Sequence, residues 1–197
     1  MGRPRTGTHT VPTVERVLEA AESAFGADGY AGTRLADVAR AAGIRRPSLL
    51  YHFSTKQVLY GAVVDRLFES LMTSLATAIE DVGDYDARVP ALMDALIDFI
   101  EARPAFSPIV LREMVDGTGP GRELLIEVVV PVLDQVEEWL NHAAGKRAPE
   151  GFDFRGAIVQ MTINAMVRAA SGPLREPIWG RPTDRTLLRR LFFLDRT

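Results

Sequence analysis

Apolar positions repeat with the spacing of an amphipathic α-helix through most of this chain. A first stripe covers residues 13–27 and ends at a series of glycines. A second, shorter stripe follows Thr33, which suits a helix N-cap, and Gly43 ends it with a residue that turns the chain sharply. A third helix is predicted for residues 46–53, because Pro47 is acceptable in a first helical turn. The pattern therefore predicts three short helices, the last two joined by a tight turn.

The rest of the chain is also predicted to be helical, so the expected fold class is all-α. A fourth helix is expected from Ser54 to about residue 81, since Ser54 and Gln57 have the spacing of a capping box. Pro131 predicts a kink in a later helix. Residues 172–182 are too rich in proline and glycine for a regular helix or strand and are predicted to be irregular. The other expected helices cover residues 89–102, 105–116, 122–144, 154–171 and 183–194.

The third predicted helix buries few of its side chains. Leu49 and Phe53 are expected to face inward. The remaining side chains around this helix are mostly basic, hydroxyl-bearing or aromatic, namely Arg45, Arg46, Ser48, Leu50, Tyr51 and His52. Two short helices with such a surface, joined by a glycine turn, are typical of a helix-turn-helix. Two ordinary amphipathic helices of a bundle are the alternative, but they seldom present so many hydrogen-bonding groups.

Charge is distributed unevenly along the 197 residues, whose formal net charge is −3. Residues 1–60 hold eight Lys or Arg against five Asp or Glu, a surplus of +3, and the remainder holds 15 against 21, or −6. A basic surplus beside the helix-turn-helix suits phosphate binding. Residues 1–10 lack periodicity and predict a flexible arm, either solvated or reaching into the minor groove with Arg3 and Arg5.

Composition also narrows the chemistry. The chain has no cysteine, which excludes disulfides and thiolate metal sites, and no apolar run approaches the ~18 residues of a membrane span. A soluble, cytoplasmic protein is expected, since no signal-peptide pattern is present. An enzyme is disfavoured, because the histidines are only His9, His52 and His142 and no nucleophile motif or phosphate loop is found. Asp84 and Asp86 predict a solvated turn, so no metal and no cofactor is predicted.

The stretch from Thr13 to Leu59 resembles the N-terminal domain of the TetR family of transcription regulators. The resemblance rests on Ala-Phe-Gly-Ala-Asp-Gly-Tyr, on Gly-Thr-Arg-Leu-Ala-Asp-Val-Ala-Arg-Ala-Ala-Gly-Ile, and on Leu-Tyr-His-Phe followed by Ser-Thr-Lys. It implies contacts with double-stranded operator DNA at Thr33, Arg45, Arg46, Ser48, Leu50, Tyr51, His52 and Lys56. For Lys56, in the first turn of the fourth helix, a solvated charge is the alternative.

Two positions depart from the family pattern. Arg45 stands where a small hydroxyl residue commonly caps the recognition helix, and losing such a cap costs about 0.5–2 kcal/mol. Leu50 stands where an aromatic residue is usual. Leucine cannot donate to a phosphate, so it either contacts a thymine methyl or packs. The operator of a typical member is therefore not implied for this chain.

The resemblance also implies how the chain is organised. Residues 1–10 form a basic arm, 11–56 a helix-turn-helix DNA-binding domain and 57–197 a helical domain for effector binding and dimerisation. The homodimer is expected through the last two helices, with packing inside one chain as the alternative for the apolar residues Leu187, Leu188, Leu191, Phe192 and Leu194. Candidate effector contacts, each of which has core packing as its alternative, are Met93, Ile97, Phe106, Met114, Trp139, Met161, Asn164, Met166 and Arg168.

Together these features predict a homodimeric repressor that a small apolar or amphipathic effector releases from a palindromic operator. An activator, or a constitutive DNA-binding and dimerisation module without a ligand, is the alternative. A cavity in the C-terminal domain distinguishes the two, because only the first needs space for an effector.

Overall fold

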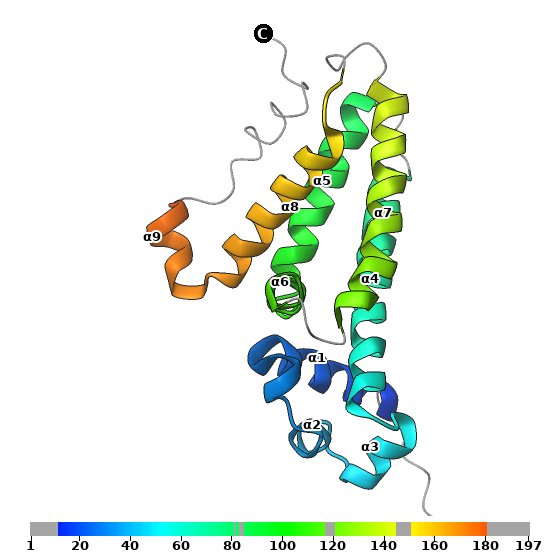
Figure 1. Ribbon diagram of the computed structural model, residues 1–197, viewed down its shortest axis with the longest axis vertical. Helices are drawn as coiled ribbons and strands as arrows, with labels where there is room; N and C mark the ends of the chain where they lie inside the picture. The colour runs from blue at the N-terminus through cyan, green and yellow to red at the C-terminus, as the bar shows by residue number, and fades with distance from the viewer. Residues whose placement is uncertain (1–11, 81, 83–84, 117–120, 145–150, 181–197) are drawn as a thin grey trace, which may run out of the picture. The chain divides into compact units, whose positions relative to one another are not determined.

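The computed structural model describes residues 12–80, 82, 85–116, 121–144 and 151–180 of the chain, and every regular element in these ranges is helical (Figure 1). The all-α fold predicted from the sequence is confirmed. The chain divides into two compact units, residues 1–63 and 64–197. The division falls within helix α4 (Lys56–Ile79) rather than at its start.

The first unit contains α1 (Thr13–Gly32), α2 (Leu35–Ala41), α3 (Arg46–His52) and the beginning of α4. Helix α2 packs against both α1 and α3. The bounds of α1 extend beyond the predicted residues, yet Gly29 inside them has φ 70°, so the chain turns there as the glycines predicted. The side chains that form the fully buried core of this unit are Val17, Ala21, Phe25, Val38, Leu49, Leu59 and Val63.

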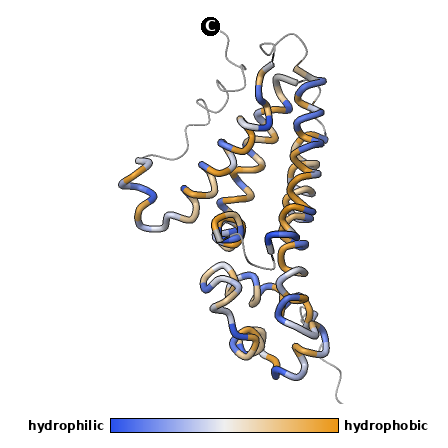
Figure 2. The backbone as a smooth tube through the Cα atoms, viewed as in Figure 1, coloured by the Kyte–Doolittle hydropathy of each residue, from blue (hydrophilic) through white to orange (hydrophobic). Residues whose placement is uncertain are grey.

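The second unit contains the rest of α4 and the helices α5 (Tyr85–Ala102), α6 (Phe106–Asp116), α7 (Gly121–Ala144) and α8 (Phe154–Ala170). Helix α8 packs against α5, α6 and α7. Figure 2 shows hydrophobic and hydrophilic positions alternating along these helices, as expected for amphipathic helices around a shared core. Asp153 begins α8 as an N-cap, because its carboxylate accepts a hydrogen bond of 2.7 Å from the backbone N–H of Gly156.

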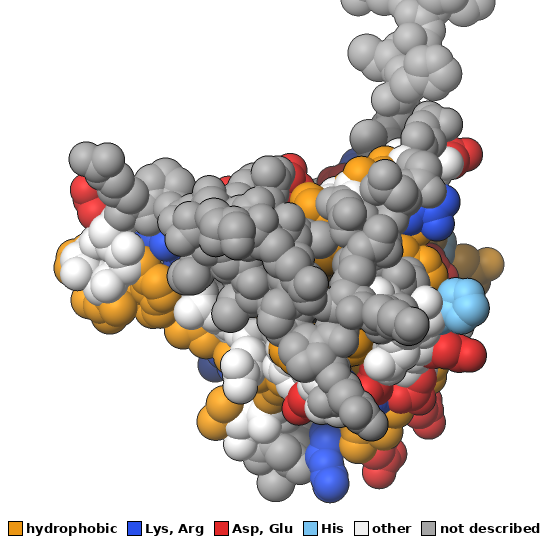
Figure 3. All heavy atoms as spheres, turned by 90° about the horizontal axis from the view of Figure 1, so that it is seen from above, with side chains coloured by type: hydrophobic (Ala, Val, Ile, Leu, Met, Phe, Trp, Pro, Cys, Tyr) orange, Lys and Arg blue, Asp and Glu red, His pale blue; other side chains and the backbone are white. Residues whose placement is uncertain are grey.

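Helical structure continues after α8, and this differs from the sequence prediction. Residues 172–182 were expected to be irregular, but the 3-10 helix η2 (Gly172–Leu174) and the short helix α9 (Arg175–Trp179) occupy most of them. Proline is acceptable in a first helical turn, and Pro173 stands at such a position in η2. Figure 3 shows hydrophobic side chains at the left of the view, on the side where Figure 1 draws α9.

Other predicted elements keep their type with shifted ends. Helix α7 continues through Pro131 without a break. Helix α5 begins four residues earlier than predicted and contains Pro90 in its second turn. The predicted helix 183–194, the basic arm 1–10 and Asp84 lie outside the described residues.

The predicted capping box at the start of α4 is wrong. The hydroxyl of Thr55 accepts the hydrogen bond from the backbone N–H of Val58, at 3.1 Å, and the helix begins at Lys56. Ser54 therefore precedes the cap by one residue. Two adjacent hydroxyl residues can each serve as an N-cap, so the sequence alone did not decide between them.

Replacing Thr55 by alanine is expected to destabilise the protein by about 0.5–2 kcal/mol, because one N–H of the first turn of α4 loses its partner. The free energy of unfolding, measured by urea denaturation, tests this. Ser54→Ala is the matched control and should change it by less than about 0.5 kcal/mol. A larger effect of Ser54→Ala than of Thr55→Ala would restore the original assignment.

Candidate nucleic-acid interface and ligand cavity

The turn between α2 and α3 is closed by backbone hydrogen bonds around Gly43. Its φ is +70°, a left-handed conformation in which a side chain is strained. The N–H of Gly43 donates to Arg40 O at 3.1 Å, and the N–H of Ile44 donates to Ala39 O at 2.9 Å. These bonds satisfy carbonyls at the end of α2, as in a Schellman-type C-cap. The predicted glycine turn is confirmed.

Gly43→Ala is expected to lower the free energy of unfolding by about 1–2 kcal/mol, since the left-handed backbone disfavours any Cβ. Gly61→Ala is the matched variant within the same unit. Gly61 lies inside α4, and neither glycine has a neighbouring atom within 4 Å of an added Cβ. Alanine at 61 should therefore stabilise the protein by about 0.5–1 kcal/mol. Thermal denaturation of both variants measures the contrast, and equal shifts would refute it.

Helix α3 buries one side and exposes the other. Leu49 is fully buried, and Phe53, which follows the helix, is 7% exposed. Tyr51 is 86% exposed, and its ring touches that of His52 at a centroid distance of 5.3 Å. The other exposed side chains of this surface, which we call the α3 surface together with Tyr51 and His52, are Arg45, Arg46 and Ser48.

The α3 surface carries positive charge that the described part of the chain does not neutralise. Neither Arg45 nor Arg46 has an ion pair or hydrogen bond from its side chain within the described residues. By contrast, Arg40 on α2 pairs with Asp37. Arg45 occupies the N-cap position of α3 without a side-chain cap bond, as the departure from the family pattern predicted. Leu50 is half-buried, so it contributes less to this surface than its neighbours.

The predicted N-cap role of Thr33 is wrong, and its side chain is not exposed beside α3 for the predicted DNA contact. It does not cap α2, whose N-cap is Arg34. Its side chain is only 3% exposed, and both its hydroxyl and its backbone N–H donate to Gly29 O, at 2.8 and 3.2 Å. With both donors used inside the unit, the residue closes the turn after α1 and does not belong to the exposed α3 surface.

Lys56, the first residue of α4, is half-buried and has partners inside the first unit. Its Nζ donates to Ala31 O at 3.2 Å and lies 4.6 Å from the centroid of the Tyr30 ring. Burial lowers the pKa of this ammonium group from its ordinary value, because desolvation disfavours the charged form. Sequence reasoning placed Lys56 near a helix N-terminus but did not find these partners, which lie 25 residues away.

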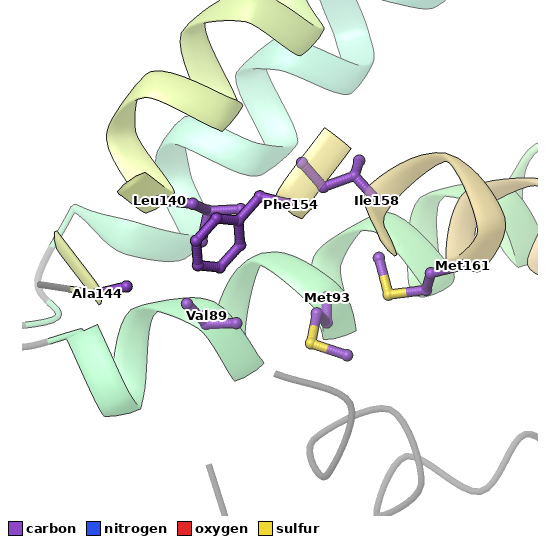
Figure 4. Close-up of a cluster of buried hydrophobic side chains, with 7 residues drawn as sticks. All are labelled: Val89, Met93, Leu140, Ala144, Phe154, Ile158 and Met161. Carbon is purple, nitrogen blue, oxygen red and sulfur yellow. The ribbon is translucent and has the colours of Figure 1, made fainter. Parts of the chain in front are cut away.

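The second unit contains a cavity of about 320 Å³ among α4, α5, α6, α7 and α8. Its walls are aliphatic, aromatic and methionine side chains, with the hydroxyl-bearing Thr162 as the one polar residue among those described. Figure 4 shows a buried hydrophobic cluster that shares the lining residues Val89, Met93, Leu140, Ile158 and Met161 with the cavity. Phe154, which lies beside Leu140 in this cluster, does not line the cavity. Lining residues that are also partly open to solvent are Met114, Ile126 and Val130.

The cavity agrees with five of the nine predicted effector contacts. Those that line it are Met93, Phe106, Met114, Met161 and Met166. The other four do not line it, so their predicted role is not supported. Ile97 is buried elsewhere in the core, and Trp139 packs against the cluster of Figure 4. Asn164 is exposed and Arg168 is buried, and neither of these two predicted polar contacts lines the cavity.

The described residues contain no group of three or more His, Asp or Glu side chains placed to hold a metal ion. They also contain no helix long and apolar enough to cross a membrane. The α3 surface and the cavity are therefore the two candidate functional sites of the described residues.

Comparison with known proteins relates the first unit to one family. Residues 17–63 match the family described as "Bacterial regulatory proteins, tetR family". The HTH-type transcriptional activator FasR of Mycolicibacterium smegmatis is 34% identical over 105 residues. This match covers 50% of the present chain and 48% of FasR, so the chain spans about half the length of that relative.

Solved structures of other proteins share the fold of this chain over most of its length. FadR of Bacillus subtilis, in complex with stearoyl-CoA, has a TM-score of 0.69 at 12% identity, covering 90% of this chain and 94% of FadR. AibR, in complex with isovaleryl coenzyme A and operator DNA, has a TM-score of 0.67 at 18% identity, covering 92% and 96% of the two chains. At these identities the likeness concerns the fold alone. Residues 17–63, in the first unit, therefore belong to the tetR family of bacterial regulatory proteins.

Proposed function

We propose that the protein is a transcriptional regulator that binds operator DNA through the α3 surface. The observation that carries this proposal is the exposure of Arg45, Arg46, Ser48, Tyr51 and His52 around a helix that buries only Leu49. Guanidinium groups bind phosphates or the O6 and N7 atoms of guanine, and hydroxyl groups bind either phosphates or base edges. Helix α3 is the second helix of the pair, which is the one that enters the major groove in this motif.

The regulator is proposed to act as a homodimer. Exposed apolar residues lie at regular spacing on the last described helices of the second unit, at Val167, Leu174 and Ile178. Asn164 is exposed one turn before Val167 on α8, so it belongs to this face. The apolar residues 187–194, proposed for the same interface, lie outside the described residues. A twofold axis would place two α3 helices in successive major grooves, about 34–36 Å apart, on a palindromic operator.

The cavity favours a ligand-responsive regulator over a constitutive one. Its walls offer almost no hydrogen-bonding group, so the part of an effector that enters must be apolar. FadR and AibR were solved with acyl-coenzyme A ligands. We therefore propose an amphipathic effector of the acyl-thioester class, with its acyl chain in the cavity. Helix α4 contributes Phe68 and Leu71 to the cavity and Leu59 to the core of the first unit, which supports a role for α4 in the response.

The protein is proposed to repress transcription, and the effector is proposed to relieve this repression. Activation is the alternative, and it is favoured by one specific observation, namely that FasR is named an activator. A reporter gene under the control of the operator distinguishes repression from activation, since a repressor lowers its expression and an activator raises it.

Selection of bound sequences from random double-stranded DNA tests the proposal as a whole. The expected product is a palindrome, bound by a dimer whose mass is measured by sedimentation. The affinity should fall steeply with salt, with a slope of about −0.9 for each phosphate contacted. Addition of acyl-CoA thioesters of several chain lengths should then weaken binding. Failure to select any sequence would refute DNA recognition, and selection without any acyl-CoA effect would favour the constitutive alternative.

A further inference from the structure

Lys56 joins the two ends of the segment that contains the helix-turn-helix. Ala31, whose carbonyl accepts the hydrogen bond of 3.2 Å from Lys56 Nζ, lies just before α2. Lys56 itself lies just after α3, as the first residue of α4. Residues 32–55 therefore leave α1 and return to α4 at one place, which this contact holds together.

The aromatic residues beneath the contact are well fixed. The ring of Tyr30, which receives the ammonium at 4.6 Å, stacks on Phe25 at 6.3 Å and meets Tyr60 edge-on at 5.1 Å. Phe25 is fully buried and Tyr60 is 2% exposed. An ammonium group over an aromatic face is attracted by the negative face of the ring. Lys56 therefore packs its charge against the core of the first unit.

The partners of Lys56 distinguish it from the arginines of α3. Arg45 and Arg46 are exposed and have no side-chain partner within the described residues, whereas Lys56 is half-buried with a carbonyl and a ring as partners. We infer that Lys56 is a positioning residue that fastens both ends of the helix-turn-helix segment, while the arginines of the α3 surface contact the phosphates.

This inference deepens the proposed DNA binding and rests on it for its functional part. Fastening the ends limits how far α2 and α3 shift against α1, so α3 is held ready to bind and loses less freedom on DNA. Losing the contact should therefore weaken operator binding without removing a phosphate contact. A direct phosphate contact would instead contribute to the salt dependence of binding, because it releases a counterion.

The test uses Lys56→Met, which keeps most of the apolar stem and removes the ammonium, Tyr30→Leu, and the double variant. Arg46→Met is the matched control for an arginine that contacts phosphate. Lys56→Met is expected to lower operator affinity about tenfold, equivalent to 1.4 kcal/mol, with an unchanged salt slope, and to lower the midpoint of thermal unfolding by about 2–4 °C. Arg46→Met should reduce the slope by about 0.9 and leave that midpoint unchanged.

A double-mutant cycle of the free energies of unfolding, measured in the absence of DNA, tests the contact of Lys56 by itself. Lys56→Met and Tyr30→Leu should be non-additive, because each removes the same contact. Additive effects on stability would overturn the inference, whether or not the protein binds DNA. A salt slope reduced by Lys56→Met to the same extent as by Arg46→Met would also overturn it. Failure of the wild-type protein to bind any DNA would refute the proposed function but leave the cycle as a valid test of the contact.

Discussion

Tyr51→Ala is expected to lower operator affinity by roughly ten- to a hundredfold while leaving the folded protein equally stable. Tyr51 is 86% exposed and its one ring contact in the described part of the chain is with His52. Substitutions at such exposed positions usually change stability by less than about 0.5 kcal/mol. An aromatic ring so exposed contributes little to folding, so its expected role is in the proposed binding of DNA. Titration of labelled operator and thermal denaturation measure the two effects separately.

Two further variants make this result interpretable. Tyr51→Phe removes only the hydroxyl group, so it separates hydrogen bonding to DNA from contact by the ring. Val115→Ala is the control for exposure, because Val115 is 82% exposed on α6 in the second unit and should change neither quantity. Leu49→Ala, at a fully buried position in α3, should cost about 2–5 kcal/mol of stability and lower binding through unfolding. Unchanged affinity of Tyr51→Ala would move the contact surface away from the exposed side of α3.

The features of the first unit that were predictable are those that depend on local sequence. Gly43 follows the last apolar position of its helix, and only glycine adopts φ +70° there without strain, so the turn was visible. Leu49 and Phe53, four residues apart, share one face of α3 and were predicted to be buried, as they are. The family resemblance rested on the same local features, and the matched residues 17–63 cover them.

The parts that were missed depend on contacts or on competition between similar residues. Threonine is a favourable N-cap residue, but the hydroxyl of Thr33 donates a hydrogen bond to Gly29 O, four residues earlier in the chain. Ser54 and Thr55 are both good caps, and tertiary structure selects Thr55. The contact of Lys56 with Ala31 joins residues 25 positions apart, and no local pattern predicts such a pair. For Thr33 and Lys56, the prediction assigned a polar side chain to a helix end or to DNA, whereas its partner lies elsewhere in the first unit.

The cavity shows a similar limit. The sequence indicates which methionines lie on apolar helix faces, because an amphipathic helix turns its apolar face toward the core. Whether an inward residue reaches a cavity or packs solidly depends on how the helices meet, and the periodicity of one helix does not contain this information. Asn164 and Met161 differ by three positions on α8, yet Met161 lines the cavity and Asn164 is exposed. Polar effector contacts were therefore predicted where the structure has an almost wholly apolar wall.

The same apolar wall provides the second prediction with a large expected effect, made by filling the cavity. Val129 on α7 lines it, so the indole of Val129→Trp should enter the cavity of about 320 Å³, leave too little room for an acyl chain beside it and abolish the response to acyl-CoA. Operator affinity without effector should stay near the wild-type value, because the substitution lies far along the chain from the α3 surface and no effector is displaced. Val115→Trp, the same substitution at an exposed position outside the cavity, should leave the response intact.

The size of the expected loss follows from the energetics of switching. To change a ratio of 1:99 into 99:1, an effector must favour the released state by about 10⁴-fold, or ~5.5 kcal/mol. In the proposed mechanism, the acyl chain in the apolar cavity supplies this difference in affinity between the two states. Blocking the entry of the chain therefore removes it. Binding should also stabilise the wild-type protein by about 2.7 kcal/mol when the effector is at 100 times its Kd, and this should vanish in Val129→Trp. Thermal shifts and operator titrations with effector present measure both quantities. If Val129→Trp were still released from the operator by the same acyl-CoA, the effector would have to bind outside this cavity.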